Sequence, residues 1–240
     1  MNLVLTLLKN KMILIIVSVF FFVLNCIPQD DKYTGTREKM VEDQIESRGI
    51  SNQLTLDAMK KVPRHKFVPP NLLDRAYDDG PLPIGYGQTI SQPYIVAYMT
   101  AVIDPKPGQK ILEIGTGSGY QAAVLAEIIY SVFTIEIVTE LYKSSEKRLK
   151  ELGCKNVFCK NADGYYGWEK YAPFDAIVVT AAAEHIPPPL IKQLKDGGKM
   201  IIPVGSPFLN QTLILVEKNG EEITTTSLLP VRFVPFTRGD

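Results

Sequence analysis

The residues best suited to chemistry lie in a glycine-rich stretch over residues 110–120, which reads KILEIGTGSGY. An apolar run interrupted by one acid leads into glycines at three alternate positions, Gly115, Gly117 and Gly119. Glycine accepts positive φ and lets a ligand approach the backbone, because it has no Cβ atom. A strand, a glycine turn and a helix in this order form a nucleotide-cofactor cradle, with free N–H groups of the helix N-terminus aimed at the ligand. The stretch therefore predicts a cofactor site.

Spacing and charge discriminate between two classes of cofactor. The glycines follow the pattern GxGxG, which differs from the GxGxxG of dinucleotide-binding proteins. Glu113 lies in the strand before the loop, where a pyrophosphate would gain nothing from an anion but a sulfonium cofactor with an amino group could use one. Glu136 ends the next predicted strand and can bind both hydroxyls of a ribose, which would suit NAD equally well.

A third acid ends the strand that follows. Asp163 can accept a hydrogen bond from an adenine amino group, and Gly164 leaves room for the base. Acids at three successive strand ends favour S-adenosylmethionine over NAD. The predicted cofactor-binding residues are Glu113, Gly115, Thr116, Gly117, Gly119, Glu136, Asp163 and Gly164.

The regions around the glycine loop alternate between strand and helix patterns. The apolar run at 174–180 is typical of a central strand covered on both faces. Asn219 and Gly220 separate two segments that predict a hairpin. We therefore expect an α/β fold, a doubly wound and mostly parallel sheet of the Rossmann-like kind, with an antiparallel edge hairpin and an N-terminal helical extension. Further strands are expected at 132–137, 156–160, 200–204, 212–217 and 222–229, and helices at 37–48, 54–62, 71–77, 94–102, 140–152 and 187–195.

A long polar loop at 78–93 precedes the glycine-rich stretch. Its glycines and prolines predict irregular structure. It also concentrates neutral hydrogen-bonding side chains, Gln88, Thr89, Ser91 and Gln92. A long loop beside a cofactor site is where a substrate-binding lid is expected.

The totals argue against several other functions. The chain of 240 residues carries 26 basic and 26 acidic side chains, which does not favour a nucleic-acid-binding surface. Its three cysteines do not form a disulfide framework, and Cys154 and Cys159 are expected to be apolar thiols. No cysteine and histidine cluster has metal-ligand spacing, so no metal is expected. His65 lies beside a predicted turn and is expected to be structural.

The first 26 residues have the pattern of a targeting segment. Lys9 and Lys11 precede a run at 12–24 that is apolar apart from one serine, the length of a signal-peptide core rather than of a membrane span. Cys26 closes the run and resembles the lipidated cysteine of a bacterial lipoprotein signal, although Asn25 stands where a small residue is usual. An uncleaved anchor, or a misplaced start codon upstream of a cytosolic enzyme, are the alternatives.

These patterns divide the chain into three parts. Residues 1–26 form the targeting segment and residues 27–36 a linker. The catalytic domain then spans 37–240, with a helical and substrate-loop extension at 37–107 and the cofactor-binding core at 108–240.

Several motifs in a specific order resemble the protein-L-isoaspartate O-methyltransferase family. The resemblance runs from about residue 40 to residue 237, and the loop sequence QTISQP distinguishes this family from other methyltransferases. Small departures are Ile137, where a basic residue is frequent, and Glu184-His185, in a loop that usually contains proline. The motifs are VPRHKFVP at 62–69, PLPIGYGQTISQP at 81–93, LEIGTGSGY at 112–120, FDAIVVTAAA at 174–183, GGKMIIPVG at 197–205 and RFVPFT at 232–237.

This resemblance implies a function. It implies methyl transfer from S-adenosylmethionine to the free α-carboxylate of isoaspartyl residues in damaged proteins, whose ester then cyclises to a succinimide. Ser91 matches the active-site serine of the family, and Gly115, Gly117, Glu136 and Asp163 match its cofactor motifs.

The chemistry of such a transfer defines what Ser91 would do. A carboxylate with a pKa near ~4 is ionised at neutral pH and needs no general base. Ser91 is therefore expected to orient the carboxylate by a hydrogen bond rather than to act as a covalent nucleophile. Capping the following helix is its alternative role. The predicted substrate-binding residues are Thr89, Ile90, Ser91 and Val204.

Three alternative functions stay open from the sequence. These are a methyltransferase for another carboxylate or small molecule, a non-catalytic exported lipoprotein that keeps the fold, and a dehydrogenase, which the glycine spacing disfavours. The targeting segment predicts a location in the cell envelope, periplasmic or attached to the membrane through residues 12–26. Because the cofactor is made in the cytoplasm, a cytoplasmic location is the alternative. No heptad pattern is present, so a monomer is expected.

Overall fold

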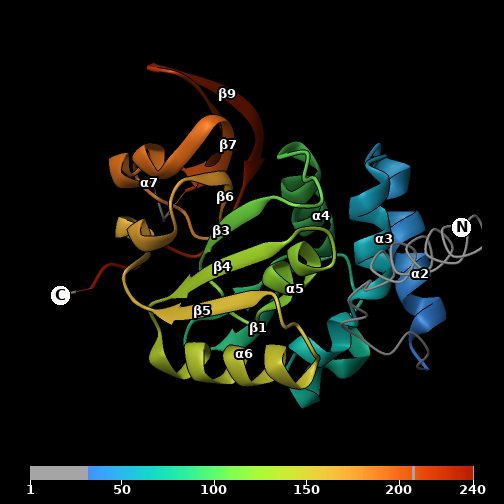
Figure 1. The fold of residues 1–240 in the computed structure, drawn as a ribbon. Coiled ribbons are helices and arrows are strands. Elements are labelled where there is room, and N and C mark those ends of the chain that lie inside the picture. Colours follow the sequence, from blue (N-terminus) through green and yellow to red (C-terminus); the bar gives the residue numbers. More distant parts are fainter. Residues whose placement is uncertain (1–31, 207–208, 240) are drawn as a thin grey trace, which may run out of the picture.

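The computed structural model describes residues 32–206 and 209–239, and the predicted targeting segment lies outside them. A seven-stranded sheet, in the order β5-β4-β3-β6-β7-β8-β9, forms the centre of the domain (Figure 1). The strands β5, β4, β3, β6 and β7 are parallel, and β8 and β9 extend the sheet as antiparallel strands. This arrangement confirms the predicted fold class. The strands are β3 Lys110–Ile114, β4 Ser131–Glu136, β5 Val157–Asn161, β6 Phe174–Val179, β7 Leu194–Val204, β8 Gln211–Asn219 and β9 Glu222–Val231.

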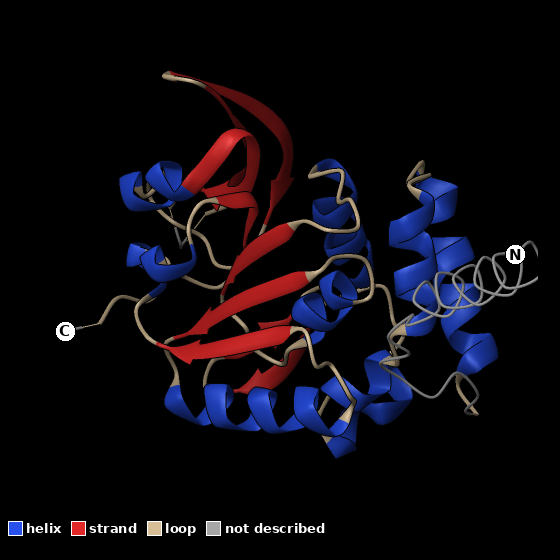
Figure 2. Cartoon of the chain, viewed as in Figure 1, coloured by secondary structure: helices blue, strands red, loops and turns tan. Residues whose placement is uncertain are grey.

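Apolar side chains on both faces of the central strands create two cores. In β3, Ile111 packs into the core beneath helices α5 (Tyr120–Ala126) and α6 (Thr139–Glu151). The alternate residues Leu112 and Ile114 pack into the opposite core, which α7 (Pro188–Gln193) covers. Figure 2 shows the helices on either side of the sheet. Side chains alternate between faces along a strand, so this pattern orients every residue at the strand ends.

The N-terminal extension packs against the α5 side of the domain. Helix α2 (Thr34–Gln44) begins inside the predicted linker, and a 3-10 turn (Glu46–Arg48) replaces the last turn of the expected helix. Asn52 caps α3 (Gln53–Lys61) by accepting a hydrogen bond from the Thr55 N–H. Two 3-10 segments follow, at Arg64–Phe67 and at Pro70–Arg75, where a short helix was expected, and α4 (Pro93–Val102) comes after the loop.

The loop at 78–93 is more regular than its composition indicates. Strands β1 (Leu82–Gly85) and β2 (Gln88–Ile90) form a two-stranded antiparallel sheet. Tyr86 and Gly87 both have positive φ, 54° and 70°, the conformation of a tight hairpin turn whose twist matches the flanking strands. The glycines and prolines of this segment therefore belong to a hairpin, and the prediction of an irregular loop was wrong.

The C-terminal tail crosses the carboxyl ends of the strands. The Phe236 N–H donates to the Ala182 carbonyl at 2.8 Å, and the Ala182 N–H donates to the Val234 carbonyl at 2.9 Å. Cys154 and Cys159 are free thiols, as expected. Within residues 32–206 and 209–239, no helix has the length and apolarity that crossing a membrane requires.

Candidate active site

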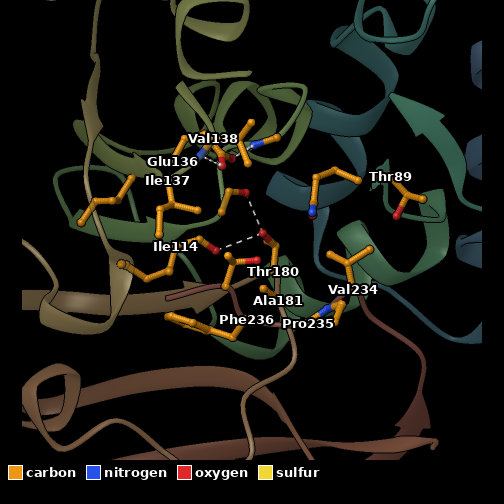
Figure 3. A pocket seen from close by; sticks show the side chains of 16 residues that line it. Thr89, Ile114, Glu136, Ile137, Val138, Thr180, Ala181, Val234, Pro235 and Phe236 are labelled. Carbon is orange, nitrogen blue, oxygen red and sulfur yellow. Dashed lines mark hydrogen bonds between the residues drawn. The ribbon is translucent and has the colours of Figure 1, made fainter. Parts of the chain in front are cut away.

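A cleft opens at the carboxyl ends of β3, β4 and β6. After β3 the chain continues to β4 on one side of β3, and it later returns to β6 on the other side of β3. The cleft therefore lies where the strand order reverses. Such a switch point is where open parallel sheets bind ligands. In Figure 3, Glu136, Ile137 and Val138 form one wall of the cleft, and Thr180, Ala181 and Phe236 lie opposite.

The glycine loop spans the floor of this cleft. The Gly115 N–H donates to the Ile135 carbonyl at 2.8 Å, which joins the loop to β4. Gly115 and Gly117 line the cleft and have φ of 95° and 51°. A Cβ atom at Gly115 would lie only 2.5 Å from the Thr180 hydroxyl oxygen, so no larger residue fits. Gly119 also has positive φ, but a Cβ there would face Leu149 of α6, and we assign this predicted cofactor residue to helix packing.

Glu136 is held rigidly in the cleft wall. The residue is only 5% exposed, and its carboxylate accepts backbone hydrogen bonds at both oxygens. Gly117 donates to Oε2 at 2.8 Å, and Val138 donates to Oε1 at 2.9 Å. Each oxygen keeps a second acceptor position, so the side chain can still accept from two neighbouring hydroxyls. The residue thus fits a ribose diol, as predicted, and it also fastens the glycine loop.

Glu113 lies beneath the loop and not in the cleft. Its position in β3 directs it to the α5 face, where it is fully buried. The Thr134 hydroxyl donates to Glu113 Oε2, and the hydroxyls of Thr134 and Thr116 lie 2.6 Å apart. Burial raises the pKa of Glu113 to about 8, which the Thr134 hydrogen bond offsets only in part. The predicted contact with the cofactor amino group is therefore replaced by support of the loop from below.

Asp163 and Gly164 were both predicted to bind the adenine base, but only Gly164 lines the cofactor cleft. The Asp163 carboxylate faces the C-terminal tail, where Oδ2 accepts from Arg238 Nε at 2.9 Å and Oδ1 accepts from the Tyr165 N–H. Burial alone would raise the pKa of Asp163, but the bonds from Arg238, Tyr165 and Gly239 outweigh it and lower the pKa. The Gly164 backbone lines the cleft, and a Cβ atom there would lie 2.3 Å from Ile114 Cγ2.

A second cavity of about 410 Å³ adjoins the cofactor cleft and contains Ser91. The Ser91 hydroxyl makes no hydrogen bond with the described residues, and α4 begins after Gln92 without a side-chain cap. The alternative role of Ser91 as a helix cap is therefore not seen. Thr89 lines both cavities, and Ile90 lines the small space between them.

Thr180 is a site residue that the sequence reasoning missed. Together with Thr89, it lines the cofactor cleft, the Ser91 cavity and the space between them. Its hydroxyl lies 3.0 Å from the Ile114 carbonyl oxygen and 2.7 Å from that of Gly115 (Figure 3), and donates to these acceptors. The sequence could have indicated this role, because Thr180 is a polar residue at the carboxyl end of an apolar strand.

Val204 lies outside the two cavities. It packs against the core beside α7 and lines neither of them, so its role in the substrate site stays a prediction. Residues 234–237 of the tail, which belong to the motif RFVPFT, line the cofactor cleft. His65 is buried against Tyr77, with Nδ1 2.7 Å from the tyrosine oxygen, which agrees with the structural role predicted for it.

The fold and the glycine loop at its switch point define a Rossmann-like methyltransferase of class I. The sequence model of protein-L-isoaspartate(D-aspartate) O-methyltransferase (PCMT) matches residues 35–240, and the chain belongs to this family.

Relatives and solved structures agree with this assignment. Protein-L-isoaspartate O-methyltransferase 2 of Shewanella sediminis is 48% identical over 233 residues, 95% of this chain and 96% of the relative. The Opitutus terrae enzyme is 56% identical over 205 residues, 85% and 88% of the two chains. A solved protein-L-isoaspartate O-methyltransferase superposes with a TM-score of 0.77 at 28% identity, over 83% of this chain and 65% of the other. The Plasmodium falciparum protein, solved with S-adenosyl-L-homocysteine, gives 0.73 at 27% identity over 85% and 99%.

The buried Glu113 predicts a pH dependence of stability. Because its pKa rises from 4.5 to about 8 on folding, the folded state keeps a proton that the unfolded chain releases between these values. The free energy of unfolding should therefore fall as pH rises through this window. In Glu113→Gln that contribution is absent, so thermal unfolding should show the melting temperature of the wild type falling relative to the variant from about pH 5 to about pH 9.

Glu140→Gln, which changes an exposed glutamate of α6, is the matched control. Its difference from the wild type should stay constant over the same range. A constant difference for Glu113→Gln as well would show that Glu113 is ionised in the folded protein.

Proposed function

We propose that this protein transfers a methyl group from S-adenosylmethionine to the free α-carboxylate of L-isoaspartyl residues in damaged proteins, which starts their repair through a succinimide. Family membership supports the reaction. The observation that carries the proposal is the meeting of two cavities at Thr89 and Thr180. One is walled by the glycine loop and Glu136, and the other is the larger cavity that contains Ser91. The working unit is proposed to be a monomer.

Residues of the cofactor cleft fit the parts of S-adenosylmethionine. Glu136 offers acceptors for the ribose hydroxyls, and the bare backbone of Gly115 and Gly117 allows close approach. Gly164 packs directly against Ile114, and both residues line the part of the cleft proposed for the base. The bound cofactor supplies an electrophilic methyl group on a sulfonium. A relative solved with S-adenosyl-L-homocysteine supports this assignment.

Ser91 supplies orientation rather than proton transfer. An isoaspartyl α-carboxylate with a pKa near ~4 is already an anion. A hydrogen bond from the Ser91 hydroxyl to one carboxylate oxygen would direct the other oxygen toward the junction with the cofactor cleft. Within the described residues, His65 bonds Tyr77 and His185 lines a separate pocket beside the tail, so neither is placed to activate Ser91.

A pair of peptides tests the substrate. A peptide with one L-isoaspartyl residue and its normal aspartyl twin have the same composition and charge. Methyl transfer from labelled S-adenosylmethionine should be confined to the isoaspartyl peptide. Equal transfer to both would favour a methyltransferase for other carboxylates. Cofactor binding without transfer to either peptide would favour a non-catalytic binding protein.

Substitution of the serine tests its role. Ser91→Ala removes the orienting donor, so kcat for the isoaspartyl peptide should fall on the order of 10²-fold, while the dissociation constant for S-adenosylmethionine stays unchanged. Steady-state kinetics and equilibrium binding measure the two quantities. Ser47→Ala on the surface, where the hydroxyl bonds only the Asp43 carbonyl, is the control. Loss of cofactor binding in Ser91→Ala would assign Ser91 to the cofactor site.

We also propose that Cys26 carries a lipid and attaches the enzyme to the cell envelope. The support comes from Lys9, Lys11 and the apolar run at 12–24 before Cys26. Residues 27–33 then lead to the start of α2, long enough to separate an anchor from the domain. Lipid labelling and fractionation of cells should find the wild type acylated in the membrane fraction, and Cys26→Ser unlabelled. An unprocessed, unlabelled wild type in the cytoplasmic fraction would support the cytoplasmic alternative, where the cofactor is made.

A further inference from the structure

The cavity that contains Ser91 is neutral except at one position. Apolar residues and neutral hydrogen-bonding side chains form most of its lining. Arg232 is the only ionisable residue among the lining residues. The others include Thr89, Ser91, Gln92, Thr180 and Asn210.

The backbone on both sides of Arg232 is fixed. Val231 ends β9 and is buried, and the Phe233 N–H donates to Gln211 Oε1 at 2.8 Å. Gln211 is only 1% exposed and also donates to the carbonyls of Ser206 and Leu209. One buried amide therefore joins three segments and presents Arg232 at a defined place on the cavity wall.

The Arg232 side chain is exposed and available to bind a ligand. Within residues 32–206 and 209–239, it forms no ion pair or hydrogen bond. Arg238, six residues further along, pairs with Asp163 and stacks on the Tyr165 ring. A guanidinium presents a planar fork of donors that matches a carboxylate. The Arg232 guanidinium at the cavity wall is therefore suited to bind a carboxylate of the substrate.

The reacting carboxylate is the wrong partner for this cation. Methyl transfer removes the negative charge of that group, so a paired guanidinium would stabilise the reactant more than the transition state and slow the reaction. Ser91, a neutral donor, avoids this cost. A second carboxylate keeps its charge throughout the reaction. Pairing with it strengthens ground-state and transition-state binding equally, which lowers KM and leaves kcat unchanged.

We propose that Arg232 is a specificity-determining residue, which selects isoaspartyl sites that have an acidic side chain next to the damaged residue. The inference rests on the proposed function, because it concerns the substrate of the same site. Ion pairs at exposed positions change an equilibrium by up to about fivefold. The expected preference for an acidic neighbour is therefore about fivefold in kcat/KM, carried by KM.

Peptides that differ in one neighbour test the proposal. Each contains one L-isoaspartyl residue, flanked on one side or the other by Glu, Gln or Lys. The wild type should prefer the Glu peptides to the Gln peptides about fivefold in kcat/KM. Arg232→Gln should abolish the preference, and Arg232→Glu should reverse it in favour of Lys. Lys143→Gln on α6, outside the cavity, removes the same net charge and should retain it.

The outcomes separate this inference from the proposed function. S-adenosylmethionine affinity should be equal in all these variants, which also shows that they fold. An unchanged preference in Arg232→Gln, or an equal loss on the Glu, Gln and Lys peptides, would overturn the role of Arg232 but leave the proposed function intact. If the wild type methylated none of the isoaspartyl peptides, the proposed function would fail, and this inference with it.

Discussion

The site depends on the attachment of the glycine loop to the two strands on either side of β3. The Gly115 N–H donates to the end of β4, Glu136 accepts from Gly117, and the Thr180 hydroxyl binds the Ile114 and Gly115 carbonyls after β6. A loop of three positive-φ glycines is conformationally expensive to order. These bonds order it before any ligand arrives, so cofactor binding need not supply that ordering free energy.

The two halves of the site use different chemistry for a physical reason. The cofactor cleft relies on bare glycine backbone and on a carboxylate that two backbone amides hold in place. The cavity beside it offers Ser91, Thr89 and other neutral side chains, with Arg232 at its wall. A nucleophilic anion loses its charge as it reacts, so neutral donors orient it without trapping it in the reactant state. Thr89 and Thr180, which line both spaces, lie where alignment has to be most accurate.

The three acids around the cofactor cleft have structural and functional roles that are hard to separate. Glu113, Glu136 and Asp163 all lie at or near strand ends, yet only Glu136 lines the cleft. Glu113 faces the α5 core and supports the loop through Thr134 and Thr116. Asp163 joins the tail that closes one side of the cleft. The three acids form one assembly around the cofactor site, although they contact different parts of it.

Local pattern determined much of this protein from its sequence alone. The glycine spacing, the mostly apolar strand at 174–179 and the family motifs led to the sheet, the cofactor and Ser91, because neighbouring residues determine backbone conformation and the periodicity of burial. Tertiary structure decided which face each side chain takes and which distant segments meet. Glu113 turned to the core because strand parity and its pairing with Thr134 direct it under α5. Thr180 and the tail reached the cleft, and Val204 did not, because these contacts join residues far apart in the chain, which no local pattern encodes.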